Sequence, residues 1–88
     1  RTLIDYYRLT ITTARQVTIT MRSDRIDSFL VLFNSTGGQL NADDDSGGGS
    51  TGFDARIVTT LQPGTYIIGA NSVGPETGPY TLSVLSVL

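Results

Sequence analysis

The sequence predicts an all-β domain, an antiparallel sandwich or barrel of about eight short strands, and three observations support this prediction. Thr, Val, Ile, Leu and Tyr dominate the chain, and apolar residues often alternate with polar ones, which is the pattern of a strand with one buried face. Turn-forming residues recur about every 8 to 12 residues. No stretch of the sequence repeats its apolar residues with the period of an amphipathic helix. Because 88 residues hold one small core, we expect residues 1–88 to form a single domain.

The chain opens with two alternating segments, residues 5–12 (DYYRLTIT) and residues 17–22 (VTITMR). Their predicted inward faces are Tyr7, Leu9 and Ile11 in the first segment and Val17, Ile19 and Met21 in the second. The predicted outward face of the first segment carries Tyr6, Arg8 and Thr10. The short link at residues 13–15 (TAR) suits a hairpin turn, so we expect the two strands to be neighbours.

Residues 28–34 (SFLVLFN) are apolar on both faces of the expected strand. This pattern indicates a central strand covered on both sides, or a strand whose outer face is a contact surface. The chain then turns through Gly37 and Gly38, since glycine adopts positive φ at little cost. Residues 39–42 (QLNA) are expected to return as a short strand that pairs with residues 28–34 in a hairpin.

The second half of the chain contains three further strand patterns, at residues 55–61 (ARIVTTL), 65–72 (TYIIGANS) and 80–88 (YTLSVLSVL). The first two are joined by QPGT, in which Pro63 and Gly64 stand in the order that a type II turn prefers. Residues 73–79 (VGPETGP) are expected to form a loop.

Composition argues against several classes of function. Charged residues make up 16% of the chain, the net charge is -2, and the six basic residues are dispersed arginines, so we expect no nucleic-acid partner. His and Cys are absent, which removes Ser-His-Asp and Cys-His catalysis, His-ligated zinc and disulfides. No segment is apolar over a membrane-spanning length, so no membrane insertion is expected. Arg1 begins within strand-like sequence, and the chain is expected to be a piece of a longer protein.

Several short motifs follow the aromatic-rich first segment in a characteristic order. They are Asp27, Leu30 and Leu32 in D-x-x-L-x-L; Gly38, Leu40 and Asp43 to Asp45 in the next turn; Leu61, Gly64, Thr65 and Tyr66 in L-x-x-G-T-Y; and Gly78, Tyr80, Thr81 and Leu82 in the closing strand. The series covers nearly the whole chain and resembles the bacterial pre-peptidase C-terminal domain family.

This resemblance implies a jelly-roll-like β-sandwich and a non-catalytic accessory domain of a secreted bacterial protein, in particular a peptidase. Domains of this kind usually follow the catalytic domain, and many are thought to be removed during maturation. The implied roles are attachment to substrate or a surface, and support of export or maturation. The implied partners are the parent catalytic domain or an extracellular polymer or protein substrate, the domain being a monomer outside the cell or at its surface.

Two other functions stay open at this point. One is a carbohydrate-binding or adhesin-like module, although such modules usually stack sugars on exposed aromatic rings, and this chain has no Trp and 8% aromatic residues. The other is a structural spacer in a surface protein.

The acidic segment NADDDSGGGSTGFDARI (41–57) has three interpretations. The first is a Ca2+ site, because Ca2+ takes six to eight oxygen ligands and clustered carboxylates on a glycine-rich loop provide them. The candidate ligands are Asp27, Asp43, Asp44, Asp45 and Asp54. The related collagen-binding domains of clostridial collagenases bind calcium, but the acidic segment that precedes their first strand is missing here. The second interpretation is a solvated turn, and the third is a linker between domains.

A candidate binding surface consists of Tyr6, Arg8, Phe29 and Phe33, which are expected to lie off the main core face. It is interpreted either as an exposed aromatic patch for a polymer or protein partner or as a second buried face of the sandwich. Arg8 and Arg22 are expected to point outward from neighbouring strands, where they would grip an acidic partner or be solvated charges. The glycosylation pattern at Asn34 is treated as a chance match.

Overall fold

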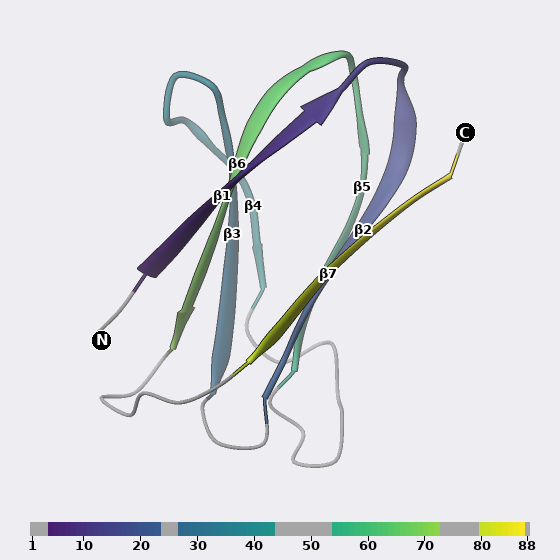
Figure 1. Cartoon of the computed structure of the whole chain (residues 1–88). Coiled ribbons are helices and arrows are strands. Elements are labelled where there is room, and N and C mark those ends of the chain that lie inside the picture. The colour runs from purple at the N-terminus through teal and green to yellow at the C-terminus, as the bar shows by residue number, and fades with distance from the viewer. Residues whose placement is uncertain (1–3, 24–26, 44–53, 73–79, 88) are drawn as a thin grey trace.

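The computed structural model of the chain describes residues 4–23, 27–43, 54–72 and 80–87 (Figure 1). These residues form seven strands and no helix, which confirms the all-β prediction. The strands are β1 (Ile4–Ile11), β2 (Arg15–Arg22), β3 (Ser28–Asn34), β4 (Gln39–Asp43), β5 (Ala55–Leu61), β6 (Gly64–Ser72) and β7 (Thr81–Val87). The sequence predicts about eight strands, and the patterns that it places at particular residues all correspond to one of these seven.

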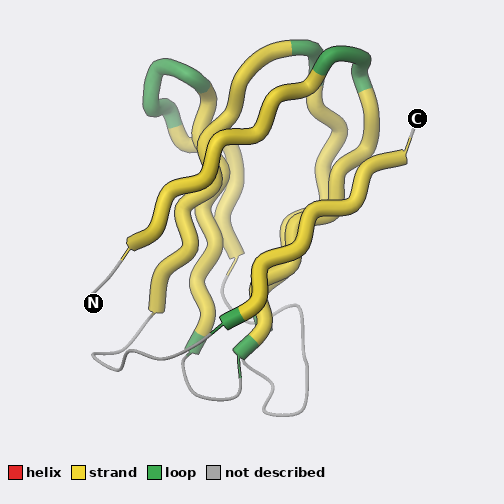
Figure 2. Tube along the Cα trace, viewed as in Figure 1, coloured by secondary structure: helices red, strands yellow, loops and turns green. Residues whose placement is uncertain are grey.

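The strands form two antiparallel sheets that face each other as a sandwich (Figure 2). The four-stranded sheet has the order β1-β6-β3-β4, and the three-stranded sheet has the order β5-β2-β7. Among the described strands, β3 and β4 are the one pair that is adjacent both in the chain and in a sheet. Most strand pairings therefore join segments that are distant in sequence.

The predicted hairpin between the first two strands is wrong. β1 pairs with β6, and β2 pairs with β5 and β7 in the other sheet. Residues 12–14 carry the chain from one sheet to the other at the top of Figure 1. Alternation shows which side chains point inward but not which strands pair with each other. A short link therefore suits both a hairpin within one sheet and a connection from one sheet to the other. Consequently Arg8 and Arg22 lie in different sheets and not on neighbouring strands.

The hydrophobic core lies between the two sheets. Its buried apolar residues are Ile11, Val17, Ile19, Met21, Leu30, Leu32, Ala55, Ile57, Leu61, Ile68 and Ala70. The register aligns them across strands, for example Ile19 with Ile57 and Leu32 with Ile68. The predicted inward face of β2 is confirmed, since its three apolar members are fully buried. Tyr7 of β1, which is also predicted to face inward, is 39% exposed because β1 is an edge strand.

The turn between β3 and β4 is held by the side chain of Asn34. Its Oδ1 atom accepts hydrogen bonds from the backbone N of Thr36 (3.1 Å), the hydroxyl of Thr36 (2.8 Å) and the backbone N of Gly38 (2.8 Å). Gly37 has a φ of 93°, a conformation that favours glycine. The predicted hairpin of β3 and β4 is confirmed, and its turn curls toward the outer face of the sheet, away from the other sheet (Figure 1).

Candidate functional site

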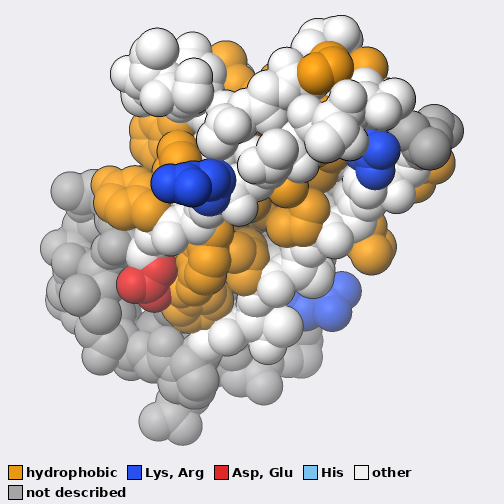
Figure 3. All heavy atoms as spheres, turned by 45° about the horizontal axis from the view of Figure 1, so that its top comes forward, with side chains coloured by type: hydrophobic (Ala, Val, Ile, Leu, Met, Phe, Trp, Pro, Cys, Tyr) orange, Lys and Arg blue, Asp and Glu red, His pale blue; other side chains and the backbone are white. Residues whose placement is uncertain are grey.

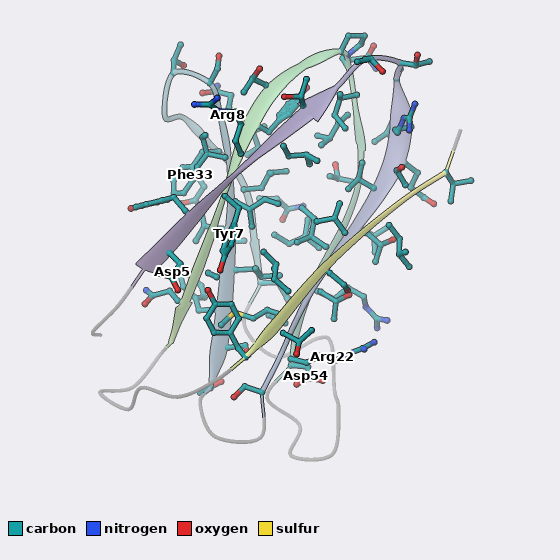
Figure 4. All side chains as sticks on the ribbon, viewed as in Figure 1. Asp5, Tyr7, Arg8, Arg22, Phe33 and Asp54 are labelled. Carbon is teal, nitrogen blue, oxygen red and sulfur yellow. The ribbon has the colours of Figure 1, made fainter. Side chains whose placement is uncertain are left out.

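Three of the four residues predicted to form a binding surface lie near one another on the outer face of the four-stranded sheet. In the register of β1 and β6, Tyr6 lies opposite Gly69 and Arg8 lies opposite Ile67. In the register of β3 and β6, Phe33 also lies opposite Ile67. Ile67 is therefore flanked by Arg8 on one side and by Phe33 on the other. Figure 4 shows Arg8 and Phe33 close together near β1.

A pocket of about 250 Å³ opens on this face, lined by Tyr6, Phe33, Gly37 and Ile67. The rings of Tyr6 and Phe33 are in contact, with centroids 6.4 Å apart and planes inclined at 56°. Gly37 contributes from the β3–β4 turn, which curls over this side of the sheet. The pocket is therefore apolar, and a basic side chain stands next to it.

The accessibility of these side chains suits contact with a partner. Tyr6 is 63% exposed, Arg8 is exposed, and Phe33 is half-buried. The space-filling view likewise shows hydrophobic side chains reaching the surface next to basic ones (Figure 3). The side chain of Tyr6 is therefore accessible to a partner on the outer face of the sheet. The binding role of these residues stays a prediction.

Phe29 does not join the pocket. It lies opposite Asn71, four residues from Phe33 along β3, which separates the two by roughly 13 Å. The two phenylalanines share a face of the sheet but not a site.

Two residues of the pocket are absent from the sequence prediction, Ile67 and Gly37. Their inclusion requires knowing that β6 lies between β1 and β3 and that the β3–β4 turn curls over the sheet. One signal was available in the sequence. In the TYIIGANS segment, alternation directs Ile68 and Ala70 inward, which leaves Ile67 as an apolar residue at an outward position.

Asp43 and Asp54, candidate calcium ligands within the described residues, accept backbone hydrogen bonds. Oδ2 of Asp43 accepts a bond of 2.9 Å from the backbone N of Arg56, which joins the end of β4 to β5 in the other sheet. Oδ1 of Asp54, a residue only 6% exposed, accepts a bond of 3.2 Å from the backbone N of Ser23. Both carboxylates therefore stabilise strand ends whether or not they bind a metal ion.

The other candidate ligands leave the calcium prediction open. Asp44 and Asp45 lie outside the described residues. Asp27 is half-buried, just before β3. Within the described ranges, no group of three or more Asp, Glu, His or Cys residues is placed to hold a metal ion.

The strands on either side of the acidic segment belong to one sandwich, because β5 pairs with β2 and β4 pairs with β3. This arrangement disfavours the interpretation as a linker between domains.

Comparison with known proteins identifies the family. The family model of the bacterial pre-peptidase C-terminal domain matches residues 4–72. The chain belongs to this family. No curated protein and no solved structure matches it. The match spans β1 to β6, and the closing motif at Tyr80 to Leu82 lies beyond the matched residues.

In this pre-peptidase C-terminal domain, a polar cluster joins the two sheets at their open edges. The hydroxyl of Tyr80, just before β7, donates a hydrogen bond of 2.6 Å to Oδ2 of Asp5 on β1. The hydroxyls of Tyr7 and Tyr80 are also hydrogen-bonded to each other. Figure 4 shows Asp5 and Tyr7 along β1. The contact holds β7 to β1, two strands that belong to different sheets.

Tyr80 of this cluster is poorly suited to act as a general base. Burial, followed by the hydrogen bonds to Asp5 and Tyr7, raises the pKa of Tyr80 far above the usual value for tyrosine. The hydroxyl therefore remains protonated at any physiological pH, whereas a general base needs a pKa near the working pH.

Within the part of the chain that the structure describes, no helix is long and apolar enough to cross a membrane.

Proposed function

We propose that this domain is a non-catalytic accessory module of a secreted bacterial protein, in particular a peptidase, and that it attaches its parent to protein substrate. The observation that carries the proposal is the exposed apolar pocket of Tyr6, Phe33, Gly37 and Ile67 beside Arg8, in a chain without His or Cys. Family membership supports an accessory role and a location outside the cell. Export or maturation of the parent is compatible with the same surface.

The shape of the pocket supports a protein ligand over a polysaccharide. Sugar rings stack on flat, exposed aromatic faces. Here the rings of Tyr6 and Phe33 are inclined at 56° to each other, and Phe33 is half-buried. A tilted pair of this kind encloses a side chain more readily than it supports a flat ring.

Co-sedimentation of the 88-residue chain with insoluble protein and with insoluble polysaccharide tests the proposal. We expect retention on the protein, and we expect Tyr6→Ala to reduce it. Leu85→Ser is the matched control, because Leu85 is 68% exposed on the other sheet and should not affect retention. Retention on polysaccharide alone would favour the carbohydrate-binding alternative, and robust hydrolysis of any protein substrate by the chain would refute the proposal.

A further inference from the structure

The outer face of the four-stranded sheet combines an apolar pocket with one cation. Along β1, β6 and β3, Arg8 is the single charged residue among the described outward positions, which the pairing of the strands defines. Arg8 is exposed and makes no ion pair with another described residue. The chain as a whole carries a net charge of -2, so the charge beside the pocket is opposite in sign to that of the molecule. This arrangement favours a ligand that is apolar at one point and anionic at the next.

The volume of the pocket fits a single side chain. A cavity of about 150 Å³ accommodates benzene, whereas pockets for whole small molecules measure about 300 to 1,000 Å³. The pocket here, at about 250 Å³, lies between these limits. It therefore suits one aromatic or large aliphatic group that belongs to a longer molecule.

The spacing along β1 specifies the longer molecule. Tyr6 and Arg8 are two residues apart on one face of a strand, which places their Cα atoms roughly 7 Å apart. Residues i and i+2 of an extended peptide have the same spacing. A peptide that lies over this face can therefore place an apolar side chain against Tyr6 and a carboxylate against Arg8.

We infer that the pocket of Tyr6, Phe33, Gly37 and Ile67, together with Arg8, binds an extended segment of a substrate protein that carries a large apolar residue two positions from Asp or Glu. This inference rests on the proposed function and specifies its ligand. Arg8 is the determinant of charge preference, and the Tyr6–Phe33 pair is the determinant of apolar preference.

Titration of the isotope-labelled 88-residue chain by NMR tests the inference, with a blocked Gly/Ser peptide that contains Phe-Gly-Glu as the probe. We expect amide shifts that concentrate at Tyr6, Arg8, Gly37 and Ile67. Because one side chain and one exposed ion pair drive association, the dissociation constant should be on the order of 1 mM. Replacing Phe by Ser in the probe should abolish the shifts. Replacing Glu by Lys should weaken binding by roughly two- to five-fold.

The reversal of charge preference is the sharpest test. Arg8→Glu should bind the Phe-Gly-Lys probe more tightly than the Phe-Gly-Glu probe, whereas Arg22→Gln, on the other sheet, should retain the original preference. Thermal melts show whether each variant is folded. Unchanged preference in Arg8→Glu, shifts that map to the three-stranded sheet, or shifts at the pocket that depend on protein concentration alone would each overturn the inference. The last of these outcomes would identify a second copy as the occupant.

The same samples separate this inference from the proposed function. Mass spectrometry of the probe after the titration should show it intact. Cleavage would contradict the non-catalytic role without affecting the docking result. Absence of shifts with an intact probe would contradict the docking inference and leave the accessory role in place.

Discussion

The hydroxyl of Tyr66 donates a hydrogen bond of 2.7 Å to the backbone carbonyl oxygen of Gln62, four residues earlier in the chain. The bond spans the corner at which the chain leaves β5 in one sheet and enters β6 in the other. Tyrosine corners of β-sandwiches use the same contact from a tyrosine hydroxyl to an upstream backbone group. Pro63, Gly64 and Thr65 lie between them, within the segment QPGT that the sequence predicts as a turn. Gly64 already begins β6 and has a φ of 155°, so the predicted type II geometry is not formed.

Tyr66→Phe removes this bond and keeps the ring. We expect a loss of about 1 kcal/mol in the free energy of unfolding and a decrease of roughly 4 to 8 °C in the melting temperature for a domain of this size. Thermal denaturation followed by circular dichroism measures the change. Tyr6→Phe is the control, because Tyr6 is 63% exposed and its hydroxyl should contribute little. Equal melts for the two variants would show that the corner bond does not stabilise the fold.

Ile19→Ala tests the core between the sheets. Ile19 is fully buried and lies opposite Ile57 and Val84, so truncation leaves a cavity and should cost about 2 to 5 kcal/mol. Denaturant titration measures this loss. Val58→Ala is the control on the adjacent strand, since Val58 is 51% exposed and its truncation should have little effect. A small loss for Ile19→Ala would contradict the stacking of the two sheets.

The pKa of Tyr80 predicts a decline in stability at high pH. Burial, and then the hydrogen bond to Asp5, raise the pKa of this hydroxyl in the folded state. Because the folded state holds the proton more tightly than the unfolded state, this contribution is fully present below the usual tyrosine pKa of about 10 and is lost as the pH rises above it. We expect the melting temperature to fall more steeply above about pH 10 in the wild type than in Tyr80→Phe.

An absorbance titration provides an independent check on Tyr80. One of the four tyrosines should resist ionisation until the chain unfolds, and Tyr80→Phe should remove that late-titrating group. Parallel pH profiles for the wild type and the variant would contradict the role assigned to the contact between Tyr80 and Asp5.

The calcium prediction is tested by melts in calcium and in chelator. If the acidic segment binds Ca2+, a concentration of about 100 times the dissociation constant should stabilise the fold by about 2.7 kcal/mol, which raises the melting temperature by several degrees. Asp45→Asn should reduce this increase. Asp43 and Asp54 are unsuitable for substitution, because each accepts a backbone hydrogen bond and its loss would destabilise the fold without calcium. Identical melts in calcium and chelator would favour the solvated turn.

Much of the fold follows from local patterns in the sequence. The alternation in β2 predicts that Val17, Ile19 and Met21 face inward, and all three are fully buried. The turn chemistry around Gly37 predicts the hairpin of β3 and β4, and the structure contains it. These predictions succeed because side-chain alternation and positive φ are properties of a few consecutive residues.

The candidate site was only partly predictable. Tyr6, Arg8 and Phe33 are grouped as a binding surface by their outward positions, and the structure places them around Ile67. Phe29 also has an outward position, but it lies outside the pocket because it is four residues from Phe33 along the strand. A sequence pattern indicates the face on which a residue lies, whereas the pocket also depends on position along the sheet.

The sequence alone determined that the chain forms strands, which of their faces turn inward, and which reactive side chains are absent. Only the tertiary structure decided that β6 lies between β1 and β3, and that β1 and β2 belong to different sheets. The physical reason is that pairing joins strands distant in the chain, where many partners satisfy the same alternation. The selection among them depends on the packing of the whole core, and the pocket beside Arg8 is a consequence of that selection.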